Sequence, residues 1–137
     1  MFETTVAGSL PKPAWLAEPE VLWAEWQPPE GDILEQAKLD ATELCIHAQE
    51  EAGIDIVSDG EQSRQHFVQG FLAAIDGLDF ENPKRIGIRD GRYEADCPVV
   101  TGPVSRKQSV HGAYVKHARA QTGRKLKFTL PGPMTIV

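Results

Sequence analysis

Several features that mark whole classes of proteins are scarce in this sequence of 137 residues. Its two cysteines are too few for a disulfide framework in a chain of this length, which favours a reducing, cytoplasmic setting. A net charge of −6 makes a nucleic-acid surface or an anionic membrane a poor partner. No apolar run approaches the length of a membrane span, and the first residues show no basic region followed by an apolar one. We therefore expect a cytoplasmic protein that binds neither nucleic acid nor membrane.

Motifs for metal ions and nucleotides are missing as well. The four histidines and two cysteines include no close ligand pair of the Cys-x-x-Cys or His-Glu-x-x-His kind. The sequence also has no Walker-type phosphate loop and no dinucleotide fingerprint. From its motifs, we therefore assign this chain neither a metal ligand nor a catalytic residue.

What the sequence does contain is an alternation of strand-like and helix-like segments. A composition of 41% hydrophobic and 25% charged residues is ordinary for one globular domain with its own core. The hydrophobic spacing predicts strands near residues 4–7, 54–57 and 126–130, and helices over 32–52, 63–75 and 110–121. This order favours an α/β fold with a parallel sheet and right-handed crossovers.

The first of these predicted helices is long and amphipathic. We expect Asp32 to cap its beginning and Gly53 to end it. Its apolar residues recur at three- and four-residue spacing, and Ile33, Leu44 and Cys45 belong to this set. Because a thiol on an apolar face is a small core residue, Cys45 is expected to be inert.

Two further regions have patterns of their own. Residues 14–30 carry Trp15, Trp23 and Trp26 between prolines, which predicts an ordered loop with short helical pieces. We interpret these tryptophans as packing anchors, with a ligand cage as the alternative. An insertion at about 80–104 contains a predicted β-hairpin, in which 85–89 pairs with 93–95 around a type I′ turn at Asp90-Gly91.

Turn and polar residues follow each predicted strand of the parallel sheet. The carboxyl ends of parallel strands lie at one edge, where α/β enzymes present their active-site side chains. We therefore expect three short segments to meet there: Gly8-Ser9, Asp59-Gly60-Glu61 and Pro131-Gly132-Pro133.

Two of these segments have the chemistry to hold an α-amino acid. Gly8 and Ser9 offer backbone N–H groups and a hydroxyl to a carboxylate, and Glu61 offers a negative charge to an ammonium group. The alternative is ordinary, because Gly-Ser turns are common and Asp59 and Glu61 could simply cap the helix predicted next. Arg64 could bind a substrate carboxylate or pair with Asp59.

Three segments together resemble the catalytic domain of cobalamin-independent methionine synthase. They are TTVAGSLP at residues 4–11, GIDIVSDGEQSR at 53–64 and LPGPMT at 130–135. The run SDGEQSRQHF at 58–67 is similar to the short core forms that lack the large N-terminal domain. The resemblance extends in order over nearly all of the chain.

This resemblance implies a (β/α)₈ TIM barrel that transfers a methyl group to the zinc-bound thiol of homocysteine, forming methionine. Residues 1–137 are then the N-terminal part of a single catalytic barrel domain, with about the first three βα units. In the family, the turn matching Ala7, Gly8 and Ser9 holds the homocysteine carboxylate, and the glutamate matching Glu61 holds its amino group. Asp59, Arg64 and His66 are expected to support these groups without touching the substrate.

The resemblance assigns the zinc ligands to a part of the family that this chain does not include, and it does not decide the methyl donor. The family's zinc ligands belong to later strands, and Cys45 and Cys97 do not match them, so we expect the chain alone to be inactive. Longer enzymes carry an Arg-Cys pair at the folate where Tyr93 and Glu94 stand. The donor is therefore either 5-methyltetrahydrofolate or a methyl-corrinoid protein.

Two alternative functions stay open. One is a related barrel thiol methyltransferase with a corrinoid partner, and the other is a truncated, non-catalytic amino-acid-binding fragment. Part of a barrel also leaves sheet edges and an apolar face uncovered, so we expect the fragment alone either to self-associate or to be unstable.

Overall fold

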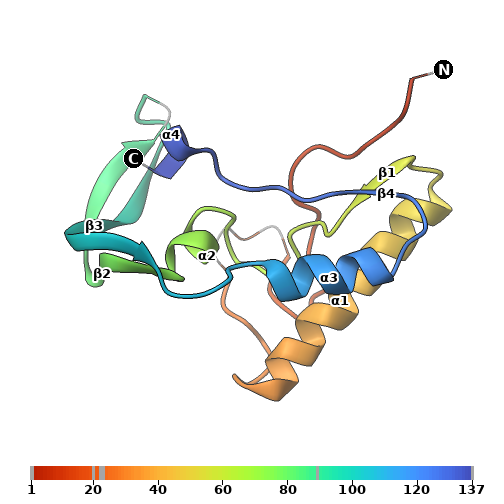
Figure 1. Ribbon diagram of the computed structural model, residues 1–137, viewed down its shortest axis with the longest axis horizontal. Coiled ribbons are helices and arrows are strands. Elements are labelled where there is room, and N and C mark those ends of the chain that lie inside the picture. The colour runs from red at the N-terminus through yellow and green to blue at the C-terminus, as the bar shows by residue number, and fades with distance from the viewer. Residues whose placement is uncertain (1, 20, 22–23, 89, 137) are drawn as a thin grey trace. The chain divides into compact units, whose positions relative to one another are not determined.

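A computed structural model describes residues 2–19, 21, 24–88 and 90–136 (Figure 1). The chain divides into two compact units, of which the first comprises Met1–Phe71 with His111–Val137 and the second Leu72–Val110. Within the described ranges no helix is both long enough and apolar enough to cross a bilayer.

The first unit is built on short parallel strands. β1 (Ile56–Ser58) pairs in parallel with β4 (Lys125–Lys127), with Val57 opposite Leu126. A parallel bridge joins Thr5 to Ile56 on the same central strand. The predicted parallel pairing is therefore confirmed, but residues 4–7 form only a bridge and the third strand begins and ends earlier than the sequence suggested.

α1 (Asp32–Glu51) is the long helix that the sequence predicts. Gly31, with φ +95°, occupies the N-cap position, and no side chain caps the helix, so the expectation for Asp32 is wrong. Asp32 is instead the first helical residue, where a negative charge suits the positive end of the helix dipole. The helix ends two residues before Gly53, whose N–H bonds to the carbonyl oxygen of Glu50 at 3.0 Å.

Two small hydrophobic clusters attach α1 to the rest of this unit. One contains Leu16, Leu34 and Ala41, and the other contains Ile46, Val57 and Ala118 from α3 (Gly112–Ala120). The buried stripe on α1 is narrower than its apolar pattern suggests. Ile33 and Leu44, which were expected on the packed face, are 63% and 55% exposed.

The helix predicted over 63–75 is mostly absent. Only α2 (Gln69–Leu72) is helical, residues 60–63 form turns, and Ile75 already begins a strand. Asp59 and Glu61 therefore cap no helix, which excludes the ordinary explanation for these two carboxylates. At the end of this unit, α4 (Pro133–Ile136) is a single helical turn.

The described residues of the tryptophan-rich segment 14–30 include no helix, so the short helical pieces expected there are not found among them, and the two described tryptophans differ in packing. Trp26 packs against the first hydrophobic cluster and is bridged to Ala17, whereas Trp15 is 47% exposed. Trp23 lies outside the described residues.

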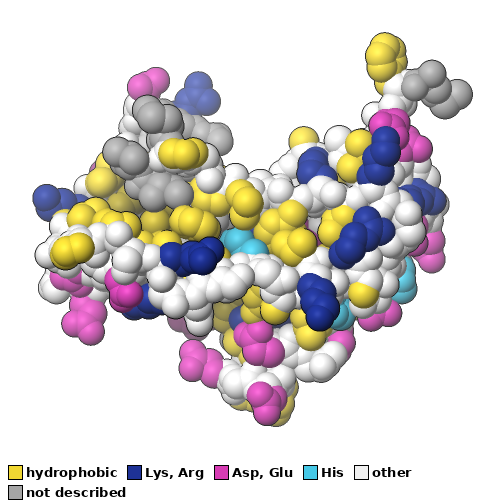
Figure 2. Space-filling view, in the orientation of Figure 1, with side chains coloured by type: hydrophobic (Ala, Val, Ile, Leu, Met, Phe, Trp, Pro, Cys, Tyr) yellow, Lys and Arg dark blue, Asp and Glu magenta, His cyan; other side chains and the backbone are white. Residues whose placement is uncertain are grey.

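The second unit is a β-hairpin that is longer than predicted. β2 (Ile75–Ile88) and β3 (Tyr93–Arg106) pair antiparallel, with Ile88 opposite Tyr93. Asp90 and Gly91 both have positive φ, +57° and +77°, and the N–H of Arg92 bonds to the carbonyl oxygen of Ile88 at 3.1 Å. Because Arg89 is not among the described residues, the type I′ turn stays a prediction. Hydrophobic groups are visible over this hairpin in Figure 2. Its exposed large apolar side chains are Phe80, Ile86, Tyr93, Val100 and Val104.

Candidate functional site

The first two predicted strand ends lie side by side in the structure. The backbone N–H of Leu10 donates a hydrogen bond of 3.1 Å to the carbonyl oxygen of Gly60. The Gln62 side chain donates through Nε2 to the carbonyl oxygen of Leu10 at 3.0 Å. These two bonds fasten the Gly8-Ser9 turn against the turn that carries Glu61.

Glutamine 49, which the sequence did not single out, holds the central strand in place. Its Nε2 donates to the carbonyl oxygen of Ser58 at 2.8 Å, and its Oε1 accepts the N–H of Ser58 at 2.9 Å. One side chain thus forms hydrogen bonds with both backbone groups of Ser58, the last residue of β1. In the sequence, Gln49 could have been recognised as a polar residue on the apolar side of α1. In the structure its side chain is buried, with only 4% of the residue exposed.

The turn after β1 has an unusual backbone. Gly60 and Glu61 both have left-handed φ values, +58° and +60°. This region is sterically unfavourable for a residue with a side chain, so the surroundings of Glu61 must hold it in this conformation. At Gly60 a side chain has no room, because a Cβ would lie 2.3 Å from the sulfur of Cys45. The two conformations together direct the chain back toward Leu10.

A buried ion pair supports this turn. Nη2 of Arg64 donates to both carboxylate oxygens of Asp59, at 3.2 and 3.1 Å, and each side chain is 2% exposed. Nη1 donates to the carbonyl oxygen of Thr129 at 2.9 Å, which links the turn to the segment after β4. Of the two roles considered for Arg64, the structure shows the pairing with Asp59. Burial raises the pKa of Asp59, and the guanidinium opposes that shift.

The residues expected to touch an amino acid differ in exposure. Ala7, Gly8 and Ser9 are exposed, and Gly8 has a φ of +79°, which glycine adopts easily. Glu61 is only 8% exposed. Burial raises the pKa of Glu61, Arg64 opposes this shift, and the neighbouring Asp59 charge adds to it.

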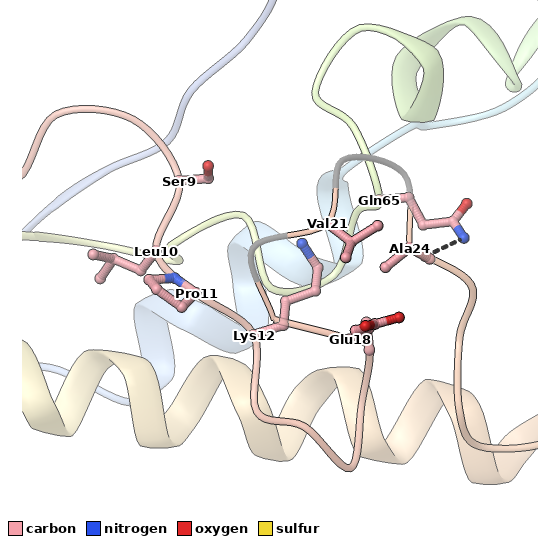
Figure 3. Close-up of a pocket in the computed structure, with 9 residues that line it drawn as sticks. Ser9, Leu10, Pro11, Lys12, Glu18, Val21, Ala24 and Gln65 are labelled. Carbon is pink, nitrogen blue, oxygen red and sulfur yellow. Dashed lines mark hydrogen bonds between the residues drawn. The ribbon is translucent and has the colours of Figure 1, made fainter.

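A cavity of about 220 Å³ opens beside the Gly8-Ser9 turn (Figure 3). Its polar wall consists of Ser9, Lys12, Glu18 and Gln65, and apolar side chains complete it. Gln65 donates its amide N–H to the carbonyl oxygen of Ala24 at 2.8 Å. The sequence analysis did not predict Lys12 as a residue of this cavity. Its position between Pro11 and Pro13, just after a predicted strand end, could have indicated it.

His66 is half-buried after the turn. Its Nδ1 accepts the backbone N–H of Gln69 at 3.4 Å, and burial lowers its pKa, which keeps the ring neutral near pH 7. Its supporting role toward the substrate stays a prediction.

The residues present do not fit a zinc ion. Across the described ranges, no three or more His, Cys, Asp or Glu side chains lie together as metal ligands. Burial raises the pKa of the half-buried Cys45 thiol to about 11, so it stays protonated at neutral pH, in agreement with the inert role expected for it. Cys97 belongs to the second unit.

These features define an α/β protein whose polar side chains gather in the turns after its parallel strands, where such proteins bind ligands. Residues 2–137 match the family described as "Cobalamin-independent synthase, Catalytic domain", and the chain belongs to this family. The resemblance of the three sequence segments is thereby confirmed.

Known proteins of this kind are similar to the chain over nearly its whole length. A solved structure of a B12-independent methionine synthase from Shewanella sp. W3-18-1, in complex with selenomethionine, is 53% identical with a TM-score of 0.91, over 97% of this chain and 38% of that one. The methionine synthase of Pyrococcus abyssi is 40% identical over 99% of this chain and 39% of its own length. The 5-methyltetrahydropteroyltriglutamate–homocysteine methyltransferase of Acidiphilium cryptum is 31% identical over 99% of this chain and 17% of its own length. The chain therefore spans about two fifths or less of these relatives.

Proposed function

We propose that this chain forms the amino-acid-binding part of a cobalamin-independent methionine synthase, which transfers a methyl group to the thiol of homocysteine and forms methionine. The observation that carries the proposal is the direct bond between Leu10 and Gly60, which fastens the Gly8-Ser9 turn to the turn bearing Glu61. The selenomethionine complex of the Shewanella relative supports an amino-acid ligand of this kind.

In this proposal each end of the amino acid meets a different turn. The exposed backbone at Ala7, Gly8 and Ser9 and the Ser9 hydroxyl receive the carboxylate. Glu61 accepts hydrogen bonds from the ammonium group, and its low exposure strengthens this charged contact because water competes less. Asp59 and Arg64 keep the second turn rigid through their buried pair.

The rest of the enzyme follows from the family resemblance. We propose that β1, β4 and the Thr5 segment are the first strands of a (β/α)₈ barrel, and that residues 1–137 belong to one catalytic domain with the hairpin as an insertion. Zinc would supply a thiolate by lowering the pKa of the homocysteine thiol. None of the residues described here is assigned as its ligand.

The methyl donor can be tested separately. Glu94, which stands with Tyr93 where longer enzymes carry an Arg-Cys pair, is engaged with Arg85 at 2.6 Å on the hairpin. Turnover assays with 5-methyltetrahydrofolate and with a methyl-corrinoid protein would decide between the two donors. Assays with other thiols in place of homocysteine would test the related thiol methyltransferase.

Replacing Glu61 by glutamine tests the binding role directly. We expect the affinity for L-methionine to fall by about 10- to 100-fold, because a charge-assisted hydrogen bond is lost. The measurement is a calorimetric titration with L-methionine and with N-acetyl-L-methionine, which has no ammonium group. Glu61→Gln should remove the preference for the free amino acid, whereas Glu94→Gln on the hairpin should keep it. An unchanged isotherm for Glu61→Gln would contradict the proposal.

Methionine binding should also weaken as the pH falls through the raised pKa of Glu61, because protonation removes the charge of this carboxylate. Burial raises the pKa of this carboxyl group, so it takes up its proton at a higher pH than an exposed glutamate does. Binding is therefore strongest above that pKa and is lost as the pH decreases through it. The affinity of Glu61→Gln should vary much less over the same range, and parallel curves for the two proteins would exclude Glu61 as the titrating group.

A further inference from the structure

Lys12 carries a positive charge that forms no direct ion pair among the described residues. It is half-buried, lines the cavity beside Ser9, and extends its side chain into it (Figure 3). Within the described part of the chain, no hydrogen bond or ion pair reaches its ammonium group, which lies 5.9 Å from the centre of the Trp26 ring. An ammonium group that has lost part of its water needs another polar partner.

Two opposite charges lie near Lys12: Glu18, which lines the same cavity, and Glu61, whose charge acts on it. Four charged groups influence one another here, and two of them, Asp59 and Arg64, neutralise each other in direct contact. Lys12 and Glu61 remain. Burial lowers the pKa of Lys12 and raises that of Glu61, so partial burial works against the charged form of both. No ion pair joins these two side chains among the described residues, although each charge affects the other.

A site that holds a cation and an anion apart is complementary to a zwitterion. We propose that Lys12 is the cationic partner of the carboxylate of the bound amino acid, opposite Glu61, which holds its ammonium group. This inference rests on the proposed function and adds a specificity-determining residue to it. Ser9 lines the same cavity as Lys12, so the backbone turn and the lysine can share one carboxylate. The ligand class is then an α-amino acid with a free carboxylate, and esters and amides are excluded.

The test compares two lysines that share a neighbour. Lys38 also lies over the Trp26 ring, at 5.0 Å, but its ammonium is paired with Glu35 at 2.7 Å and it does not line the cavity. Lys38→Met therefore removes one positive charge and one ring contact, as Lys12→Met does, without changing the cavity. Both variants, together with Lys12→Arg and Glu61→Gln, are titrated with L-methionine and with L-methioninamide, in which the carboxylate is neutral. Thermal melting shows that each variant is folded.

We expect Lys12→Met to weaken methionine binding by about 10- to 100-fold and to change methioninamide binding by less than about threefold. Lys12→Arg should keep the preference for methionine, and Lys38→Met should change neither affinity. Equal weakening of both ligands, or no weakening at all, would overturn the role of Lys12. If Glu61→Gln weakens methionine binding and Lys12→Met does not, this inference fails while the proposed function stands. If neither variant matters, the proposed function itself fails.

Discussion

Replacing Arg64 by methionine is expected to lower the free energy of unfolding by about 3–5 kcal/mol, because it leaves the carboxylate of Asp59 buried without its cation. Both side chains are 2% exposed, and the guanidinium also bonds to Thr129 and lies over the Phe128 ring at 4.4 Å. Urea unfolding followed by circular dichroism measures the change.

Two comparisons isolate the cause of this loss. In Arg64→Met with Asp59→Asn, the buried charge is gone, so the double variant should be more stable than Arg64→Met alone. Arg85→Met breaks an ion pair whose members are 68% and 61% exposed, and it should change stability little. A double variant that is no more stable than Arg64→Met would show that lost packing, not an unpaired charge, dominates.

The loss in Arg64→Met should also depend on pH. Burial already raises the pKa of Asp59, and removing the guanidinium that opposes this shift raises it further. An acid with a raised pKa in the folded state destabilises the protein when it is ionised, and this effect disappears as the pH falls below that pKa. The stability difference between the variant and the wild type should therefore shrink at acidic pH.

Gly60→Ala has the second-largest expected effect, a loss of about 2–4 kcal/mol. One part comes from the left-handed φ of +58°, and the other from a Cβ placed 2.3 Å from the sulfur of Cys45. The neighbouring Glu61 would move with the turn, so methionine binding should weaken in the same variant. Urea unfolding and calorimetric titration measure the two effects.

Variants at Gly53 and Cys45 separate the backbone cost of Gly60→Ala from the cost of its close contact with sulfur. Gly53 has a φ of +79° and open space around it, so Gly53→Ala should cost only the backbone part, about 1–2 kcal/mol. Cys45→Ala removes the clashing sulfur, and Gly60→Ala in that background should also cost about 1–2 kcal/mol. Equal losses for Gly60→Ala with and without the cysteine would show that the close contact has no effect on stability.

Much of the local structure was predictable from the sequence. The long helix, the central strand and the hairpin are present near their predicted positions, because each depends on periodicity or turn residues within a few neighbours. The helix predicted over 63–75 failed for a physical reason. Arg64 is held by Asp59 on one side and by the backbone of Thr129 on the other, and these contacts override the preference of the segment for a helix.

The site was predictable only in part. The segments that resemble the family contain Gly8, Ser9 and Glu61, and their turns do lie next to each other. Lys12 and Gln49 were missed, since neither belongs to a recognisable motif. Gln49 binds Ser58 through two hydrogen bonds that span nine residues. The role that we propose for Lys12 depends on the charge of Glu61, 49 positions later, which acts on it in the folded chain.

By itself, the amino-acid sequence determined the family, the α/β alternation and the two turns that we propose to hold an amino acid, because these are carried by neighbouring residues. Only the tertiary structure decided that Arg64 pairs with Asp59, that Glu61 takes a left-handed backbone, and that Lys12 forms no direct ion pair among the described residues. Each of these depends on which groups are packed together and buried, and such packing exists only once the chain has folded.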